Sequence, residues 1–432
     1  MSLILLSIAA LAPVALAQDI CSFNTFEAST WHASGADQYL EDWFKDHNYD
    51  EHDWLYKMDA ETTGNGDGNS AVDCKNLYGS GTCAAPQVQC KDFTPNQYYY
   101  VRQMAAQFNQ HLTTAHEWLQ DYTIANALGI DQMISDLSVQ DNNKDFMKLL
   151  ISSFTGFASM AGSVMGAYPA AASVVGVIGG GMIVTNANYR FNTGVPTTDD
   201  IKRQVENWVA AYFWETRESI KKIQNRMFGG SEVDSDTDIL DDLLNVVGQL
   251  GLDDSGYSSK ISKVLSTGAF LVSVGESDIT AAMETGFKMM KKRIIGNLLT
   301  ASNIAVFKVR MNEEKYCQNY GDRYIDGNCY QLYHPVSGHM QPVDSNILNH
   351  LEFTYDIDPA ALYVNTDRCD NSFQDGWNNR VGLEPDEFGY TPCFFDMIIM
   401  RAWEKDCVKS NWKYPDWWRH IQSDMPCRQG TS

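Results

Sequence analysis

The sequence predicts a mainly α-helical protein, in which a helical bundle encloses a hydrophobic helical hairpin between two loop-rich, disulfide-stapled ends. Three observations support this fold class. Apolar residues recur at helical spacing through the middle of the 432-residue chain, ten cysteines lie only towards its ends, and 41 consecutive residues carry no acid, base or histidine. These features divide the chain into four parts: 1–17, 18–94, 95–316 and 317–432.

The start of the chain is typical of a cleavable secretory signal. The run from Leu3 to Ala17 is uncharged and apolar and ends in a small-x-small site, so we expect residues 1–17 to be removed and the mature chain to begin near Gln18. About 15 apolar residues are short for a membrane span. We therefore expect a secreted, extracellular protein whose cysteines are oxidised.

The cysteines lie in two groups of even number. Because four and six are both even, each end of the chain can close on itself, and the sequence does not choose among the possible pairings. The cysteines expected to form disulfides are Cys21, Cys74, Cys83, Cys90, Cys317, Cys329, Cys369, Cys393, Cys407 and Cys427.

Helical periodicity predicts the bundle in residues 95–316. Two long apolar stripes indicate helices, one within 96–125 and one from the cap residues Thr197–Asp200 to Gly229-Gly230. Shorter apolar runs over 239–250 and 261–274 and a long stripe from Ser277 to Leu298 add further members. The expected bundle has about five or six helices.

The two ends carry other signals. Residues 50–90 are rich in Asp, Asn, Gly and Cys and predict loops and short turns. Asp326-Gly327 lies between β-forming residues and predicts a small β-hairpin near 322–334. In the aromatic tail we expect short helices, notably over 392–406.

The uncharged segment runs from Leu149 to Tyr189 and contains seven glycines and seven alanines. Pro169 divides it into two arms of about 20 residues, each long enough as a helix to cross about 30 Å of hydrocarbon. Small residues four apart favour close helix packing. The residues that we expect to shape this hairpin are Gly156, Gly162, Gly166, Pro169, Gly176 and Gly180.

Two interpretations of this segment remain open. In the first, it is the buried central hairpin of a water-soluble bundle. In the second, the hairpin is sheltered in the secreted form and can also leave the bundle and enter a bilayer, as in helical pore-forming toxins. Oligomerisation on the membrane would help, because three successive glycines weaken the second arm.

One cationic cluster lies in the middle part, at Lys288, Lys291, Lys292 and Arg293. If the protein is membrane-active, these residues are candidates for contact with anionic headgroups. The alternative, which the sequence favours, is that they form the solvated face of an amphipathic helix.

Evidence for catalysis is sparse. His111 and His116 lie about 140° apart on a helix, so they cannot share a metal, and His111 is expected as a hydrogen-bonded bundle residue. Glu352, Asp356 and Asp358 are the best carboxylate cluster for acid-base work. The tryptophans and tyrosine at Trp412, Tyr414, Trp417 and Trp418 could stack on a sugar, although packing explains them more simply.

Composition and motifs narrow the function. The chain has 55 acids against 32 bases, a formal charge of -23, which argues against a nucleic-acid partner. It contains no nucleophile elbow, phosphate loop or dinucleotide fingerprint. The sequence therefore assigns no catalytic residue, metal ligand or cofactor, and it favours a protein that is not an enzyme.

Four features follow one another over about residues 70–335. They are a cysteine-bearing front with Cys74, Cys83 and Cys90, the helix 98–109 with its Ala-Ala-Gln, the Gly/Ala-rich uncharged hairpin, and the Asp-Gly-Asn-Cys-Tyr turn at 326–330. In this order they resemble a family of secreted fungal proteins of uncharacterised activity. The resemblance implies a secreted fungal protein deployed against a host or competitor, and it transfers no catalytic residue.

The leading hypothesis is a secreted membrane-active protein, pore-forming toxin-like or effector-like, that works through residues 149–187. Its expected partner is a lipid bilayer or the surface of a host or competitor. The first alternative is a secreted hydrolase or carbohydrate-binding protein that uses the tail carboxylates and tryptophans. The second is a non-catalytic secreted protein with a structural or binding role.

Overall fold

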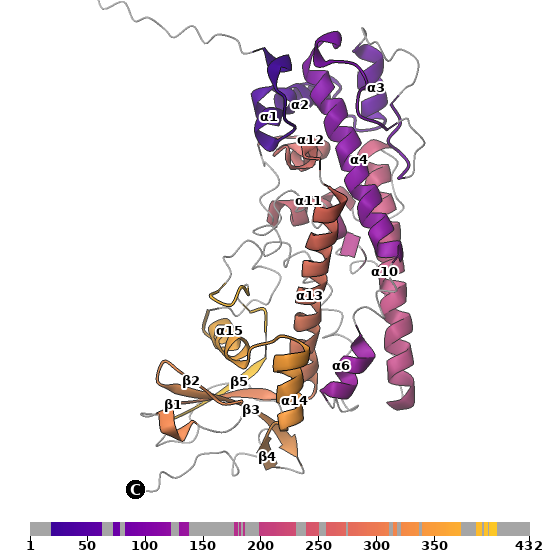
Figure 1. Ribbon diagram of the computed structural model, residues 1–432. Helices are drawn as coiled ribbons and strands as arrows, with labels where there is room; N and C mark the ends of the chain where they lie inside the picture. Colours follow the sequence, from indigo (N-terminus) through magenta and orange to yellow (C-terminus); the bar gives the residue numbers. More distant parts are fainter. Residues whose placement is uncertain are drawn as a thin grey trace, which may run out of the picture.

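The computed structural model describes residues 19–62, 72–77, 83–121, 129–137, 177–179, 181–182, 185, 198–229, 239–249, 256–273, 275–310, 314–317, 321–336, 339–372, 386–390, 393–395 and 397–403. These residues are mostly helical and include one small mixed sheet and four disulfides. The predicted mainly α fold is therefore confirmed. The helices near the start of the chain lie at one end of the molecule, and the sheet lies at the other with further helices beside it (Figure 1).

Three helices of the front, α1 (Ala28–Ala33), α2 (Ala36–Asp46) and α3 (Trp54–Glu61), lie at one end of α4 (Gln97–Asp121) (Figure 1). The prediction of loops over residues 50–90 was wrong at α3. This helix buries its apolar residues beneath a mostly polar surface, and two turns are too short for periodicity to reveal it. Disulfides Cys21–Cys90 and Cys74–Cys83 close the front on itself.

The predicted bundle helices are present. They are α4, α10 (Thr198–Phe228), α11 (Ile239–Gln249), α12 (Lys260–Leu265) and α13 (Glu276–Ala301), and a shorter helix, α6 (Ile130–Asp136), joins them. The predicted run over 261–274 is α12 followed by a 3₁₀ turn, η4 (Ala269–Leu271). Gly268 separates the two with a φ of 72°, and a Cβ there would come within 2.6 Å of the Trp31 Cβ.

Aromatic side chains join the bundle helices. Phe108 on α4 packs edge-on against Phe270 of η4 at 4.7 Å between ring centroids, and against Phe228 of α10 at 6.1 Å. The Trp54 indole donates to the backbone oxygen of Met227, which ties α3 to the end of α10. The front is thus part of the bundle core rather than a separate unit.

The sheet has five strands: β1 (Ala305–Arg310), β2 (Arg323–Ile325), β3 (Asn328–Val336), β4 (His339–Pro342) and β5 (Ile398–Trp403). The order is β2-β3-β1-β5, with β4 also paired to β3; β1 and β5 are parallel and the other pairs antiparallel. The predicted hairpin is confirmed as β2–β3, and Asp326 and Gly327 take φ of 50° and 75° at its turn.

The prediction of a helix over 392–406 was wrong, because β5 occupies much of that range. Its partner β1 lies far earlier in the chain, with Ala305 opposite Ile398, so no local pattern reveals the pairing. After the sheet hairpins come α14 (Ser345–Asn349), the π-helical turn η6 (His350–Thr354) and α15 (Pro359–Ser372). Helix α13 links the two ends of the molecule (Figure 1).

Candidate functional site

The described part of the uncharged segment is a helical stretch docked on α10. Residues 177–179, 181–182 and 185 are helical, and Val177, Ile178, Met182 and Thr185 are at most 2 % exposed. These residues belong to the second arm of the predicted hairpin. The first arm and the turn at Pro169 lie outside the described residues.

Gly181 allows the stretch to approach α10 closely. A Cβ at this position would lie 3.0 Å from the Cγ1 of Ile220 and 3.2 Å from the backbone oxygen of Thr216. The Tyr212 hydroxyl, also on α10, donates to the backbone oxygen of Met182 at 3.2 Å. Contact through a glycine and a backbone carbonyl is the geometry expected of small-residue helix pairs.

Hydroxyl groups complete this interface. Thr185 Oγ1 donates to the backbone oxygen of Gly181 at 2.8 Å, and it lies 3.3 Å from Thr216 Oγ1 and 3.1 Å from Ser219 Oγ. Thr216 in turn donates to the backbone oxygen of Tyr212 at 2.9 Å. All these side chains are buried, so the polar groups of the interface satisfy one another without charge or bulk water.

The glycines singled out from the sequence, together with Pro169, all fall outside the described residues: Gly156, Gly162, Gly166, Gly176 and Gly180. The sequence reasoning missed the residues that make the observed contact, namely Gly181 and Thr185 with Thr216 and Ser219 of α10. A signal existed, since Gly181 and Thr185 are small residues four apart and continue the same pattern.

Two of the four expected cations on α13 are engaged with the C-terminal region. Arg293 is 3 % exposed, and its guanidinium donates to the backbone oxygens of Cys393, at 3.0 Å, and Phe394. Lys292 contacts the Asp356 carboxylate at 2.9 Å and the Tyr390 hydroxyl at 3.3 Å. In this arrangement neither group is presented to a lipid surface.

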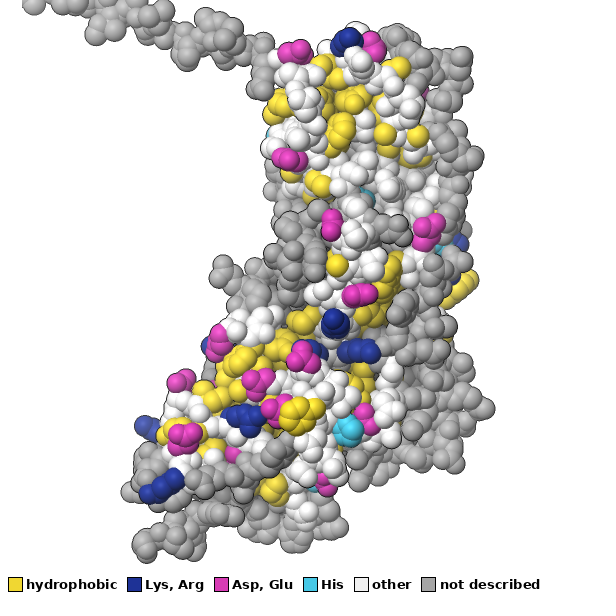
Figure 2. Space-filling view, in the orientation of Figure 1, with side chains coloured by type: hydrophobic (Ala, Val, Ile, Leu, Met, Phe, Trp, Pro, Cys, Tyr) yellow, Lys and Arg dark blue, Asp and Glu magenta, His cyan; other side chains and the backbone are white. Residues whose placement is uncertain are grey.

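The other two cations differ in exposure. Lys288 is exposed, whereas Lys291 is half-buried, and burial lowers its pKa. Basic and acidic side chains lie side by side over this part of α13 (Figure 2). The four residues therefore form neither a uniform cationic patch nor one solvated face, because Arg293 on the same helix points into the core.

The two histidines of α4 lie at different contacts, as their spacing requires. His111 is 1 % exposed, and burial lowers its pKa to about 4, although a hydrogen bond with the backbone of Val272 opposes the shift. His116 is equally buried, and burial, assisted by the positive charges of Arg217 and Lys221, also lowers its pKa to about 4. Both imidazoles are neutral at pH 7.

The tail carboxylates have separate partners. Glu352 lies 3.6 Å from the Arg323 guanidinium, Asp356 accepts from Lys292, and Asp358 accepts from the backbone N–H of Ala360 at the start of α15. Their roles in the structure are therefore those of ion pairs and a helix cap. Trp412, Tyr414, Trp417 and Trp418 lie outside the described residues.

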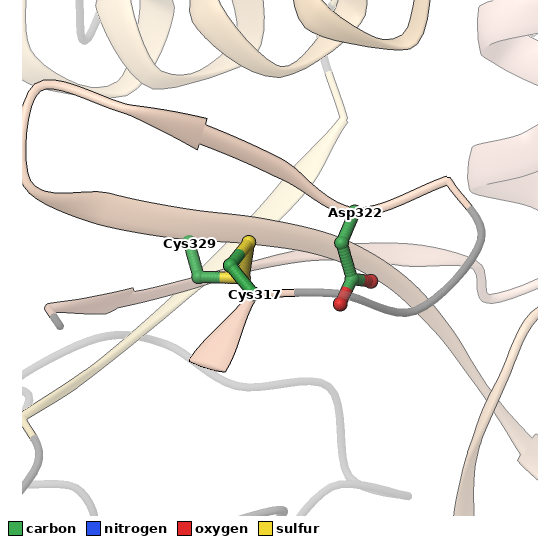
Figure 3. A group of neighbouring side chains, drawn as sticks. All are labelled: Cys317, Asp322 and Cys329. Atoms are coloured by element: carbon green, nitrogen blue, oxygen red, sulfur yellow. A yellow bond between two sulfur atoms is a disulfide. The ribbon is translucent and has the colours of Figure 1, made fainter. Parts of the chain in front are cut away.

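Within the described ranges, a single group of three acidic, cysteine or histidine side chains has its ligand atoms mutually within 4.8 Å: Cys317, Asp322 and Cys329. Figure 3 shows that the two sulfur atoms are bonded to each other. Sulfurs in a disulfide are not thiolate ligands, so this group is not a metal centre. The Asp322 carboxylate instead accepts from the Gln331 amide at 2.9 Å.

The back of the chain is also closed by its own cysteines, through Cys317–Cys329 and Cys369–Cys393. Cys407 and Cys427 lie outside the described residues. With the two disulfides of the front, these bonds indicate an oxidising environment.

No family model, curated protein or solved structure matches this chain. Of the helices that are described, none is both long and apolar enough to cross a membrane.

Proposed function

We propose that this is a secreted, membrane-active protein of toxin-like or effector-like type, whose working element is the uncharged segment 149–187. The observation that carries the proposal is the docking of residues 177–179, 181–182 and 185 on α10. There an uncharged helical stretch is buried through a glycine and mutually bonded hydroxyls. A segment buried in this way can belong to a water-soluble protein while it is docked. After release, its uncharged helices can lie in hydrocarbon.

The chemistry of the docked face supports this proposal. In lipid, helices associate through small residues and interhelical hydroxyl bonds rather than through the hydrophobic effect. Gly181 and Thr185 offer the same groups to α10 in the folded protein. These groups therefore suit pairing with another copy of the segment on a membrane, where oligomers would form.

Secretion is part of the proposal. The apolar run that ends at Ala17 supports export, and the disulfides fit an oxidising destination. The resemblance to secreted fungal proteins supports deployment against a host or competitor. The target on this reading is a lipid bilayer, and the overall negative charge favours action at low pH, where carboxylates are neutralised.

Dye release from vesicles tests the proposal directly. The purified mature protein is expected to release dye from neutral and anionic vesicles, most strongly towards pH 4. No release at any pH between 4 and 7, with any of the lipid compositions, would remove the proposed membrane activity.

A crosslink tests whether the docked stretch is the element that causes dye release. Thr185 and Ser219 have their hydroxyl oxygens 3.1 Å apart, so the double variant Thr185→Cys/Ser219→Cys can be oxidised to hold the stretch on α10. The oxidised double variant is expected to release little dye, while each single variant, which cannot crosslink, releases as much as the parent. Equal release by the crosslinked protein would show that the segment is not the working element.

A further inference from the structure

Helix α4 is held on two sides by contacts that each contain a buried histidine. His111 faces η4, and His116 faces α10. Because the two residues lie about 140° apart around the helix, they serve different interfaces. Neither was expected to act in a site, and the proposed function does not use them.

The contact between α4 and η4 is apolar. The His111 ring lies 6.2 Å from that of Phe270 and forms a hydrogen bond with the backbone of Val272. Burial lowers the pKa of His111 to about 4, and the backbone hydrogen bond only partly opposes this shift. A proton on His111 therefore brings a charge into a buried, apolar contact, which is costly.

The contact between α4 and α10 is charged. Burial is the main cause of the lowered pKa of His116; the positive charges of Arg217 and Lys221 on α10 add to it, and Glu218 opposes it. On α4 itself the neighbouring Glu117 is exposed to solvent. Burial and the two cations together disfavour a proton on His116.

Two successive turns of α10 hold residues that interact with the docked stretch and residues that interact with His116 of α4. Thr216, Ser219 and Ile220 contact Gly181 and Thr185 of the docked stretch. Arg217 and Lys221, adjacent to them in sequence, carry the charges that lower the pKa of His116. Loosening of α4 at this point removes a neighbour from the part of α10 on which the uncharged stretch is docked.

We propose that α4 is an acid-released clamp: protonation of His111 and His116 separates it from η4 and α10 and loosens the bundle around the docked stretch. The release of α4 is a property of the folded protein and needs no membrane. Its role as the trigger for insertion rests on the proposed function.

The pH at which α4 opens follows from the linkage between proton binding and opening. Burial lowers the pKa of both imidazoles from 6.5 to about 4, so an opening that exposes them takes up protons between these pH values. The clamp is closed above about pH 6.5 and weakens as the pH falls towards 4. For His111 alone, the opening equilibrium at pH 4 rises on the order of a hundred-fold relative to pH 7.

Hydrogen exchange without lipid tests the clamp. Exchange of peptides from 97–121 in the mature protein, corrected for the intrinsic pH dependence, is expected to accelerate between pH 6.5 and 4. Peptides from the sheet strand Ala305–Arg310 should stay protected and serve as the internal reference. Equal protection of the α4 peptides at pH 7 and pH 4 would overturn the proposal.

Variants separate the histidines from general acid effects. His111→Gln and His116→Gln should each remove part of the acceleration, and the double variant most of it. His52→Gln, in a side chain that is 59 % exposed, is the matched control and should behave like the parent. An unchanged pH profile in a folded double variant would also overturn the proposal. Exchange that accelerates while vesicles retain their dye would support the clamp and remove only the membrane function.

Discussion

The two ends of α13 stabilise the fold with different polar groups. At the bundle end, the buried groups around η4 and the docked stretch include neutral ones, namely His111 and the Thr185–Thr216 pair. At the sheet end, charged groups make the corresponding contacts: Arg293 donates to two backbone oxygens, and Lys308 lies 2.7 Å from the Asp367 carboxylate. These contacts of the bundle end can therefore be disrupted by added charge, whereas those of the sheet end are disrupted by removing charge.

Removal of the Arg293 side chain is expected to have the largest effect on stability. Arg293→Met leaves the backbone oxygens of Cys393 and Phe394 buried without their charged donor, which should cost about 3 kcal/mol. Urea denaturation of the two proteins measures the difference. Lys288→Met, on the exposed face of the same helix, is the control and should cost less than about 0.5 kcal/mol. Similar losses in both variants would contradict the contrast between the ends.

Acid should act on the bundle end with a comparable magnitude. The pKa of His111 is lowered from 6.5 to about 4, so its contribution is fully present above pH 6.5 and is lost as the pH falls to 4. The loss amounts to about 3 kcal/mol. Denaturation of the parent and of His111→Gln at a series of pH values checks this, and the variant should show the shallower pH dependence. Parallel curves would exclude His111 as the cause.

A smaller effect is expected at Gly181. Gly181→Ala places a methyl group 3.0 Å from Ile220 and 3.2 Å from the backbone of Thr216, so the docked stretch must shift, at a cost of about 1–2 kcal/mol. Gly275→Ala is the matched control, because its nearest neighbour would lie at an ordinary 3.6 Å. Thermal unfolding compares the two. A stable Gly181→Ala protein would mean that the close contact with α10 has room to relax.

Local sequence patterns were enough to predict the elements that depend on residues close together in the chain. The stripe of α10 and its glycine end gave that helix, and Asp326-Gly327 gave the hairpin. Elements defined by distant partners could not be predicted in this way. Strand β5 exists because it pairs with β1, and α3 because Trp54 reaches Met227 on α10.

The candidate site also combines features that local patterns predict with contacts that they do not. The missing charge over 149–189 marked the segment, and the small-residue pattern indicated close packing. Periodicity could not show which face of α10 receives it, because Thr216 and Ser219 read as ordinary polar positions. The burial of Arg293 was equally hidden, since its partners are backbone oxygens that carry no signal in the sequence.

Helix α13 is an unbroken rod of 26 residues, about 39 Å long, that reaches from the bundle to the sheet. Its sheet end is fastened by Arg293, whose guanidinium remains charged throughout the physiological pH range. A bundle that opens in acid would thus stay tethered to an intact scaffold and could close again on neutralisation. Such a protein would survive repeated passage through acidic surroundings without unfolding as a whole.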